Sequence, residues 1–196
     1  MESLSSLKIY KKLQNMGLKF VDYALLAQLV GLDNKRKLYE LTRRLQRNGV
    51  LEKMVDGKFL VSGSLAVEFE IANYAYQPSY VSLESALSYY GILSQFPYTI
   101  TSVSTRKTRK VTLRGKEYWY CRINPSLYWG YEKAGGFLIA GREKALLDTL
   151  YFHSKGLANL DISELDLSLV NRQELKRQAT KFGSRLVSAK IKEIIL

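Results

Sequence analysis

Two clusters of basic residues are the features of this sequence with the clearest chemistry. The first lies between residues 35 and 58 and holds eight Lys or Arg residues against three Asp or Glu residues. This imbalance favours a polyanionic partner, because like charges one turn apart destabilise a helix that is merely solvated. The second cluster has no acidic residue within it. Its members are Arg106, Lys107, Arg109, Lys110, Arg114 and Lys116.

Few residues suited to catalysis or metal binding accompany these clusters. The chain has one histidine, His153, and one cysteine, Cys121, so zinc sites and histidine-dependent catalysis lack ligands. Glu143, Lys144 and Asp148 match the carboxylates and lysine of a metal-dependent nuclease in residue type only. Glu143 and Lys144 diverge by about 100° on a helix and do not face one site together. We therefore predict no catalytic residue, no bound metal and no cofactor.

The composition extends the basic character to the whole chain. The 196 residues carry a formal net charge of +12, and 46% are hydrophobic, which suffices for two small cores. The best apolar run, residues 24–32, is short and interrupted by Gln28, and the N-terminus has no apolar signal core. One cysteine permits no internal disulfide, which suits a reducing compartment. We expect a cytoplasmic protein of two domains with no membrane partner.

Hydrophobic periodicity places most of the first basic cluster on a helix. Leu38, Leu41 and Leu45 lie at i, i+3 and i+7, which predicts an inward stripe on a helix that starts from Asp33 or Asn34. At about 100° per residue, the basic side chains project from the other sides of this helix. The helix is therefore predicted to be apolar toward the core and basic toward solvent.

Further elements are predicted before and after this helix. Apolar spacing indicates one helix over about 3–16 and a shorter one beginning near Asp22, a good N-cap residue. After the basic helix the pattern becomes strand-like, and the turn Val55-Asp56-Gly57 joins two runs in a β-hairpin. Lys53 and Lys58 flank the predicted tip of this hairpin.

Three helices followed by a hairpin are typical of a winged helix-turn-helix, which we predict over residues 1–64. In such a domain the basic helix enters the major groove of double-stranded DNA and the hairpin reaches phosphates beside it. The alternatives are a solvated helix face and a winged helix that binds protein. The residues predicted to contact DNA are Asn34, Lys35, Arg36, Lys37, Tyr39, Arg43, Arg44, Arg47, Lys53 and Lys58.

Residues 65–196 are predicted to form a second domain, with an antiparallel sheet and flanking helices, so that the fold class is α+β. The small, polar Ser62-Gly63-Ser64 is the expected junction, with Ser64 capping the first helix of the second domain and Ser82 capping the next. Strand-rich segments follow at 98–104, 110–113, 116–123 and 137–140.

The last part of the chain is expected to return to helix. The segment 142–152 has helical apolar spacing, and Asn171 and Ser184 are predicted to cap two further helices. The second basic cluster, residues 106–116, falls on a predicted hairpin and is a candidate second polyanion site. The alternative is a solvated hairpin whose charge prevents edge-to-edge association of sheets.

Two segments of the second domain resemble the C-terminal domain of AbiEi-type antitoxins. They are residues 80–111 (YVSLESALSYYGILSQFPYTITSVSTRKTRKV) and 136–152 (GFLIAGREKALLDTLYF). Their distinctive parts are Ser85-Ala86-Leu87 and the run from Glu143 to Asp148. The resemblance extends over most of the chain from about Tyr23 to Phe152, and it departs from the family at Gly141-Arg142, where a polar, acidic helix start is usual.

The resemblance implies a type IV antitoxin. Such a protein represses its own operon through its first domain, and its second domain opposes a nucleotidyltransferase-like toxin without requiring a stable complex. The expected DNA partner is then an operator with inverted repeats. A winged-helix regulator with no toxin partner and a nucleic-acid-processing enzyme targeted by the winged helix are the alternatives.

Overall fold

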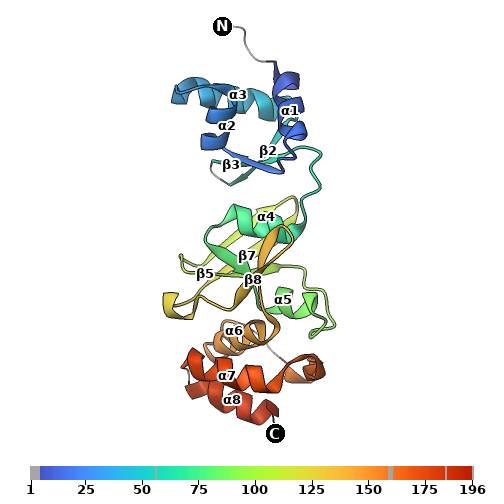
Figure 1. The fold of residues 1–196 in the computed structure, drawn as a ribbon, viewed down its shortest axis with the longest axis vertical. Coiled ribbons are helices and arrows are strands. Elements are labelled where there is room, and N and C mark those ends of the chain that lie inside the picture. Colours follow the sequence, from blue (N-terminus) through green and yellow to red (C-terminus); the bar gives the residue numbers. More distant parts are fainter. Residues whose placement is uncertain (1–4, 56, 159–160, 184, 196) are drawn as a thin grey trace. The chain divides into compact units, whose positions relative to one another are not determined.

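The computed structural model describes residues 5–55, 57–158, 161–183 and 185–195. In these residues the fold is α+β, with eight α-helices, a three-stranded antiparallel sheet and a six-stranded mixed sheet (Figure 1). The chain divides into two compact units, Met1–Val67 and Glu68–Leu196. The predicted turn residue Asp56, the predicted cap Ser184 and the start of the first predicted helix lie outside the described residues.

The first unit contains three helices and the three-stranded sheet. Its elements are α1 (Ser6–Asn15), β1 (Phe20–Asp22), α2 (Tyr23–Val30), α3 (Lys35–Arg47), β2 (Leu51–Val55) and β3 (Lys58–Val61). The strands pair antiparallel in the order β1–β3–β2. Leu13, Leu26 and Leu45 from the three helices pack with Phe59 of β3 in one apolar core, so the helices cover the face of the sheet that Phe59 occupies.

Local sequence sets the helix boundaries of this unit. The Asp22 carboxylate accepts a hydrogen bond from the Leu25 N–H at 2.8 Å, and the Asn34 side chain accepts one from the Lys37 N–H at 3.0 Å, which confirms both caps. Gly31 ends α2 in the left-handed region, at φ 66°, where glycine alone carries little strain. β1 is not predicted from the sequence, because three residues are too few to show strand alternation.

The second unit is built around the six-stranded sheet. Its strands are β4 (Ser79–Val81), β5 (Ile100–Ser104), β6 (Arg109–Leu113), β7 (Lys116–Arg122), β8 (Tyr131–Ala134) and β9 (Phe137–Ala140). Its helices are α4 (Glu68–Ala75), α5 (Glu84–Tyr89), α6 (Arg142–Ser154), α7 (Arg172–Phe182) and α8 (Arg185–Ile195). α4 covers one face of the sheet and α5 and α6 the other, while α7 and α8 pack on α6 (Figure 1).

The six-stranded sheet is mixed, so the predicted antiparallel sheet is only partly right. The strand order is β6–β7–β5–β4–β9–β8, in which β5 runs parallel to β7 and β4 parallel to β9. The cause is non-local: β7 lies between β5 and β6, although these two strands are consecutive in the chain. Strand patterns in a sequence predict which segments are extended, but they do not predict which segments pair or in which direction.

Two predicted helix caps are wrong. Ser64 caps no helix, because α4 begins only at Glu68. Ser82 is fully buried, and its hydroxyl donates to Asp148 Oδ2 at 2.8 Å instead of accepting from a helix N–H. Leu83, at φ 58°, takes the cap position of α5 without a side-chain hydrogen bond. For Ser82, the hydrogen bond to Asp148 of α6 takes the place of the predicted cap.

Candidate nucleic-acid interface

α3 separates an apolar stripe from a basic surface. Leu38, Leu41 and Leu45 are 8%, 8% and 0% exposed, which confirms the predicted inward stripe. Arg44 is half-buried and lies at the edge of the basic surface. The other predicted contact residues of α3 and its cap are exposed: Asn34, Lys35, Arg36, Lys37, Tyr39, Arg43 and Arg47.

Contacts within this surface hold some of its side chains in place. The Arg43 guanidinium lies 5.8 Å from the centre of the Tyr39 ring, a cation–π distance. Arg36 Nε lies 3.3 Å from Glu40 Oε1, and both side chains are exposed. A pair of this kind contributes at most about 1 kcal/mol, so a phosphate can displace the carboxylate. Asn34 is engaged as the cap of α3, so it positions the helix start.

The β2–β3 hairpin divides its two lysines between opposite faces of the sheet. Lys53 pairs with Phe59, and directly opposed residues share a face, so Lys53 lies on the side that the helices cover. Lys58 precedes Phe59 in β3 and projects from the other face, opposite Asp22 of β1. Lys53 is exposed and Lys58 half-buried. Only Lys53 therefore lies on the same side of the sheet as α3.

The second basic cluster is also divided by the pleat of a strand. In the β6–β7 ladder, Arg109 lies opposite Tyr120, whereas Lys110 lies opposite Trp119. The Tyr120 hydroxyl donates to the Ala72 carbonyl of α4 at 2.8 Å, so Arg109 projects on the α4 side. Lys110 projects on the side of α5, with its ammonium 5.2 Å from the centre of the Trp119 ring.

Members of this cluster differ in their charged neighbours. Lys110 Nζ is 3.4 Å from Glu117 Oε1, and Lys116 Nζ is 3.6 Å from Glu68 Oε1. Arg106 and Lys107 precede β6 at the end of the hairpin away from its turn and are exposed, as is Arg114 in the turn itself. The six residues therefore do not form a single basic surface.

A buried polar cluster lies between α6 and β4. Lys144 and Asp148 are both 0% exposed and form an ion pair one helical turn apart. Lys144 Nζ also donates to the Tyr80 hydroxyl at 2.9 Å. The Asp148 Oδ2 atom accepts from the Tyr80 and Ser82 hydroxyls at 3.0 and 2.8 Å. Both charges are thus neutralised and hydrogen-bonded inside the second unit.

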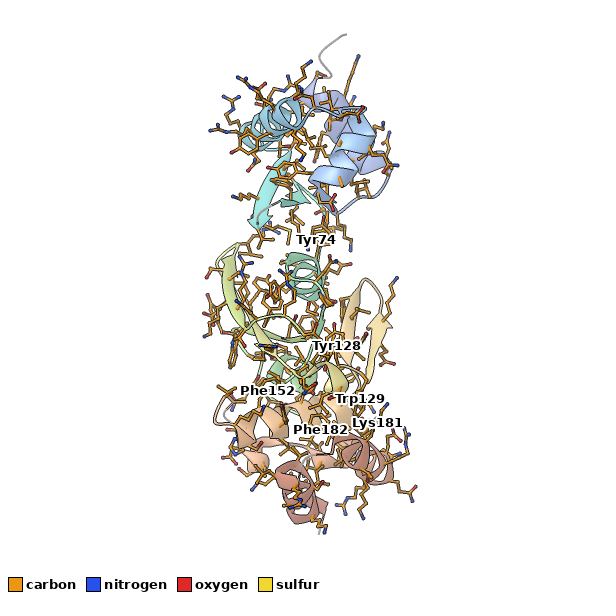
Figure 2. The ribbon with its side chains drawn as sticks, turned by 90° about the vertical axis from the view of Figure 1, so that its left-hand side faces the viewer. Tyr74, Tyr128, Trp129, Phe152, Lys181 and Phe182 are labelled. Carbon is orange, nitrogen blue, oxygen red and sulfur yellow. The ribbon has the colours of Figure 1, made fainter. Side chains whose placement is uncertain are left out.

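Aromatic side chains close this cluster off from solvent. Lys144 Nζ is 5.2 Å from the centre of the Trp129 ring and 5.3 Å from that of Phe182, and Figure 2 shows these two rings together beside Lys181. Burial lowers the pKa of Lys144 and raises the pKa of Asp148, and the opposite charge of each partner counteracts both shifts. The pair is therefore an enclosed structural element with no face toward a substrate.

Sequence reasoning rejected a nuclease site at Glu143, Lys144 and Asp148 but missed this ion pair. The available signal was the i, i+4 spacing of Lys144 and Asp148 within an apolar helix. Glu143 lies apart from the pair, and its Oε1 accepts from the Asn171 N–H at 2.9 Å. Asn171 in turn caps α7, as predicted, by accepting from the N–H groups of the next turn.

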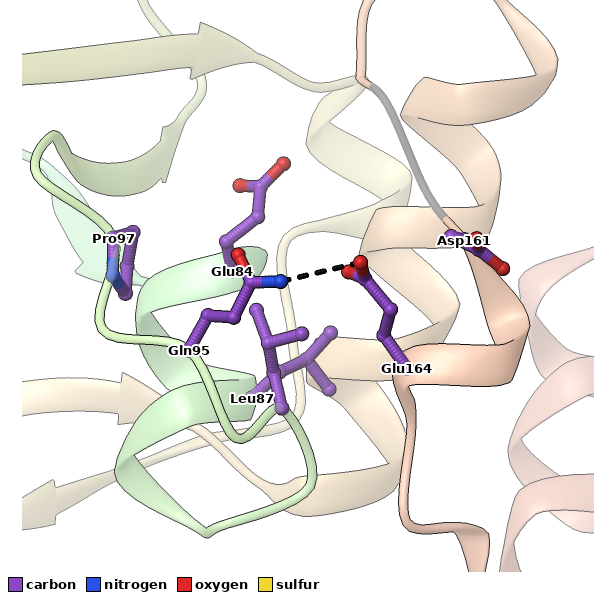
Figure 3. Close-up of a pocket in the computed structure, with 7 residues that line it drawn as sticks. Glu84, Leu87, Gln95, Pro97, Asp161 and Glu164 are labelled. Atoms are coloured by element: carbon purple, nitrogen blue, oxygen red, sulfur yellow. Dashed lines mark hydrogen bonds between the residues drawn. The ribbon is translucent and has the colours of Figure 1, made fainter.

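A small acidic cavity of about 270 Å³ lies beside α5 (Figure 3). It is lined by Glu84, Leu87, Leu93, Gln95, Pro97, Asp161 and Glu164. The Gln95 amide donates to Glu164 Oε1 at 3.2 Å, and burial raises the pKa of Glu84. The carboxylates repel phosphate groups, so this cavity does not belong to a nucleic-acid interface.

Comparison with known proteins adds no relative. No protein-family model matches the chain, and neither does any curated protein sequence. Among the described residues, no three His, Cys, Asp or Glu side chains are arranged to hold a metal ion. None of the described helices combines the length and the apolar character needed to cross a membrane.

Proposed function

We propose that the first unit is a winged helix-turn-helix domain that binds double-stranded DNA through α3. The observation that carries the proposal is the division of α3, which packs three leucines into the core and presents exposed cations to solvent. α2 and α3, joined by a short turn and followed by the β2–β3 hairpin, have the element order of such domains. In the complex, α3 would lie in the major groove with Lys53 beside a phosphate.

The arginines of α3 are the proposed readers of sequence. A guanidinium can donate two hydrogen bonds to the O6 and N7 atoms of guanine in the major groove. Arg36 and Arg43 are exposed, and Arg43 is already held against Tyr39. Lys35 and Lys37, in the first turn, carry point charges suited to phosphates.

We further propose that the chain represses its own operon and acts as the antitoxin of a type IV system. The support is the resemblance of residues 80–111 and 136–152 to AbiEi-type antitoxins. On this proposal the second unit opposes a nucleotidyltransferase-like toxin, and no direct contact with the toxin is required. A regulator without a toxin partner is the alternative, and the reading frame adjacent to the gene distinguishes the two.

DNA binding is tested with the full chain and the DNA upstream of its own gene. Fluorescence anisotropy compares this DNA with a scrambled duplex for the wild type and the Arg36→Ala/Arg43→Ala variant. A lost base contact costs about 1–3 kcal/mol, so affinity for the upstream DNA should fall by about 10-fold or more, and by a smaller factor for the scrambled duplex.

A charge-matched control separates this effect from a loss of net charge. Lys8 and Lys11 are exposed on α1, and Lys8→Ala/Lys11→Ala removes the same two charges. We expect this control to lower both affinities slightly and equally. The proposal fails if the wild type binds neither duplex, or if the α3 variant and the control lose affinity by the same factor on both duplexes.

A further inference from the structure

Four exposed cations of the second unit gather around the loop between β5 and β6. They are Arg106, Lys107, Arg109 and Arg122, here termed the β6 loop surface. Arg122 is not among the residues singled out from the sequence, because it lies in β7, beyond the basic cluster. It joins the others only through the pairing of the strands.

The chain path explains why these residues meet. The loop 105–108 leaves β5 and passes the end of β7, since β7 lies between β5 and β6. Arg122 lies opposite Ser104 in the β5–β7 ladder, and its N–H donates to Thr108 Oγ1 at 3.2 Å. Alternation along β7 places Arg122 on the same face as Tyr120, and Arg109 shares that face because it lies opposite Tyr120.

Hydrogen bonds and a buried ring fix this loop. Arg106 lies with its guanidinium 4.6 Å from the centre of the Tyr76 ring and donates from Nη1 to the Gln77 carbonyl at 3.1 Å. Arg109 contacts the same ring at 5.8 Å. The Tyr76 hydroxyl donates to the Lys107 carbonyl at 2.8 Å. The Arg106 and Arg109 guanidiniums and the loop backbone are therefore held in place before any ligand arrives, which lowers the entropic cost of binding.

Charge is uncompensated at this end of the hairpin. In the part of the chain that the structure describes, none of the four cations forms an ion pair. By contrast, Lys110, on the other face of β6, lies near Glu117, and Lys116, at the turn end of the hairpin, lies near Glu68. Four like charges held together repel one another, and a polyanion removes that repulsion.

We infer that the β6 loop surface binds the phosphodiester backbone of DNA without reading its sequence. Guanidinium groups donate paired hydrogen bonds to phosphate oxygens, and the site offers three of them with no acidic neighbour in an ion pair. The choice of DNA rests on the proposed function. A duplex bound by the first unit keeps its phosphates at high effective concentration around a covalently linked second unit.

The test measures binding of the full chain to a 30-bp duplex of arbitrary sequence over a range of salt concentrations. The log-log slope is about −0.9 per phosphate neutralised, so Arg106→Gln/Arg109→Gln should make it shallower by almost two. The matched control, Lys110→Gln/Lys116→Gln, removes the same charge from the two lysines of the hairpin that lie beside carboxylates. It should change the slope by less than half as much.

Two further variants make each outcome decisive. Arg106→Lys/Arg109→Lys keeps the charge and should restore the slope, which excludes misfolding as the cause of a loss. In chains that also carry Arg43→Gln/Arg47→Gln on α3, the loop substitutions Arg106→Gln/Arg109→Gln should still make the salt slope shallower. If the α3 substitutions change the salt slope and the loop substitutions do not, this inference is wrong, but the proposed DNA binding by α3 stands. If the loop substitutions change the slope and the α3 substitutions do not, the inference stands, but the proposed role of α3 is wrong.

An arm with RNA tests the choice of nucleic acid. An RNA duplex of the same length is titrated with the same variants. The inference holds if the loop substitutions weaken DNA binding at least as much as RNA binding. It is overturned if they weaken RNA binding alone, or if the matched control and the loop variant change the DNA slope equally.

Discussion

Lysine occupies three different environments in this protein, and each gives it a different role. Lys144 is buried and paired with Asp148, Lys110 is exposed beside Glu117, and Lys107 is exposed without an ion pair in the described structure. Burial makes a charge costly unless a partner compensates it, whereas an exposed pair contributes little. The buried pair is therefore the one whose loss should affect stability most.

Replacing Lys144 with Met should destabilise the second unit by about 3–5 kcal/mol, because Asp148 is left as an uncompensated buried carboxylate. The Lys144→Met/Asp148→Leu double variant should be less destabilised than Lys144→Met alone. Both tryptophans, Trp119 and Trp129, lie in the second unit, so urea unfolding followed by tryptophan fluorescence reports on this unit. A double variant as unstable as the single one would contradict this account.

The same variant should show a defined dependence on pH. Burial raises the pKa of Asp148 above the ordinary value of 3.8, and removing Lys144 removes a charge that opposes this shift. The unfolded chain then ionises Asp148 before the folded chain does, so the folded state loses stability as the pH rises. Relative to wild type, Lys144→Met should be least destabilised below about pH 4 and most destabilised near neutrality. If the loss of unfolding free energy in Lys144→Met is the same at every pH, an uncompensated Asp148 carboxylate is not its cause.

Cys121 should be chemically silent in the folded protein. Its side chain is 2% exposed, and burial raises the pKa of the thiol to about 12, so little thiolate is present at neutral pH. Ellman's reagent should react with the native chain only at the rate of unfolding, and with one thiol at once in urea. Rapid reaction of the native chain would show that β7 is open to solvent.

At the scale of elements, the helical period predicted the two sides of α3 correctly. Leu38, Leu41 and Leu45 are buried and the arginines are exposed or at the edge, because a local repeat of 3.6 residues determines which side chains share a face. Strand registers are not local. The separation of Lys53 from Lys58 follows from the pairing register of β2 and β3, which the sequence patterns did not predict. Arg109 and Lys110 are separated by simple alternation, because β6 begins at Arg109, one residue before the predicted strand.

The same distinction explains what else the sequence did not predict. β1 and β4 contain only three residues, too few for a recognisable alternation, and β8 has the charged pair Glu132-Lys133 at its centre. The sheet is mixed because β7 lies between β5 and β6, and this strand order cannot be predicted from the pattern of any single segment. Ser82 is predicted as a cap, but its hydroxyl donates to the buried Asp148 carboxylate instead. The burial of the Lys144–Asp148 pair was not predicted, because charged pairs at i, i+4 usually lie on the surface.

The hairpin register yields a prediction for DNA binding. Lys53 lies on the side of the sheet that carries α3, so Lys53→Ala should make the log-log salt slope shallower by about 0.9, one phosphate contact. Lys58→Ala removes an equal charge from the opposite face and should leave the slope unchanged. Titration of both variants with the upstream duplex compares them directly. Equal effects of the two substitutions would mean that the hairpin approaches DNA differently from this account.

At the scale of the whole molecule, the two compact units suggest a division of labour. In the proposed scheme the first unit binds the operator and the second opposes the toxin. Arg36→Ala/Arg43→Ala in the full chain should abolish repression in a promoter reporter but preserve growth rescue beside the toxin, because neither side chain is in the core. If the variant folds but rescue is lost together with repression, protection depends on DNA binding and the two-function scheme is wrong.

The central claim, that α3 lies against DNA, can be tested most directly by photo-cross-linking. Tyr39 is 54% exposed on α3, and p-benzoylphenylalanine at this position is a conservative replacement; Met16, 52% exposed just after α1, provides a control in the same unit. With the full chain and a radiolabelled upstream duplex, we predict a DNA adduct from position 39 that salt and unlabelled duplex suppress, and little adduct from position 16. Equal adducts from both positions, or an adduct from position 16 alone, would contradict the placement of α3 in the groove.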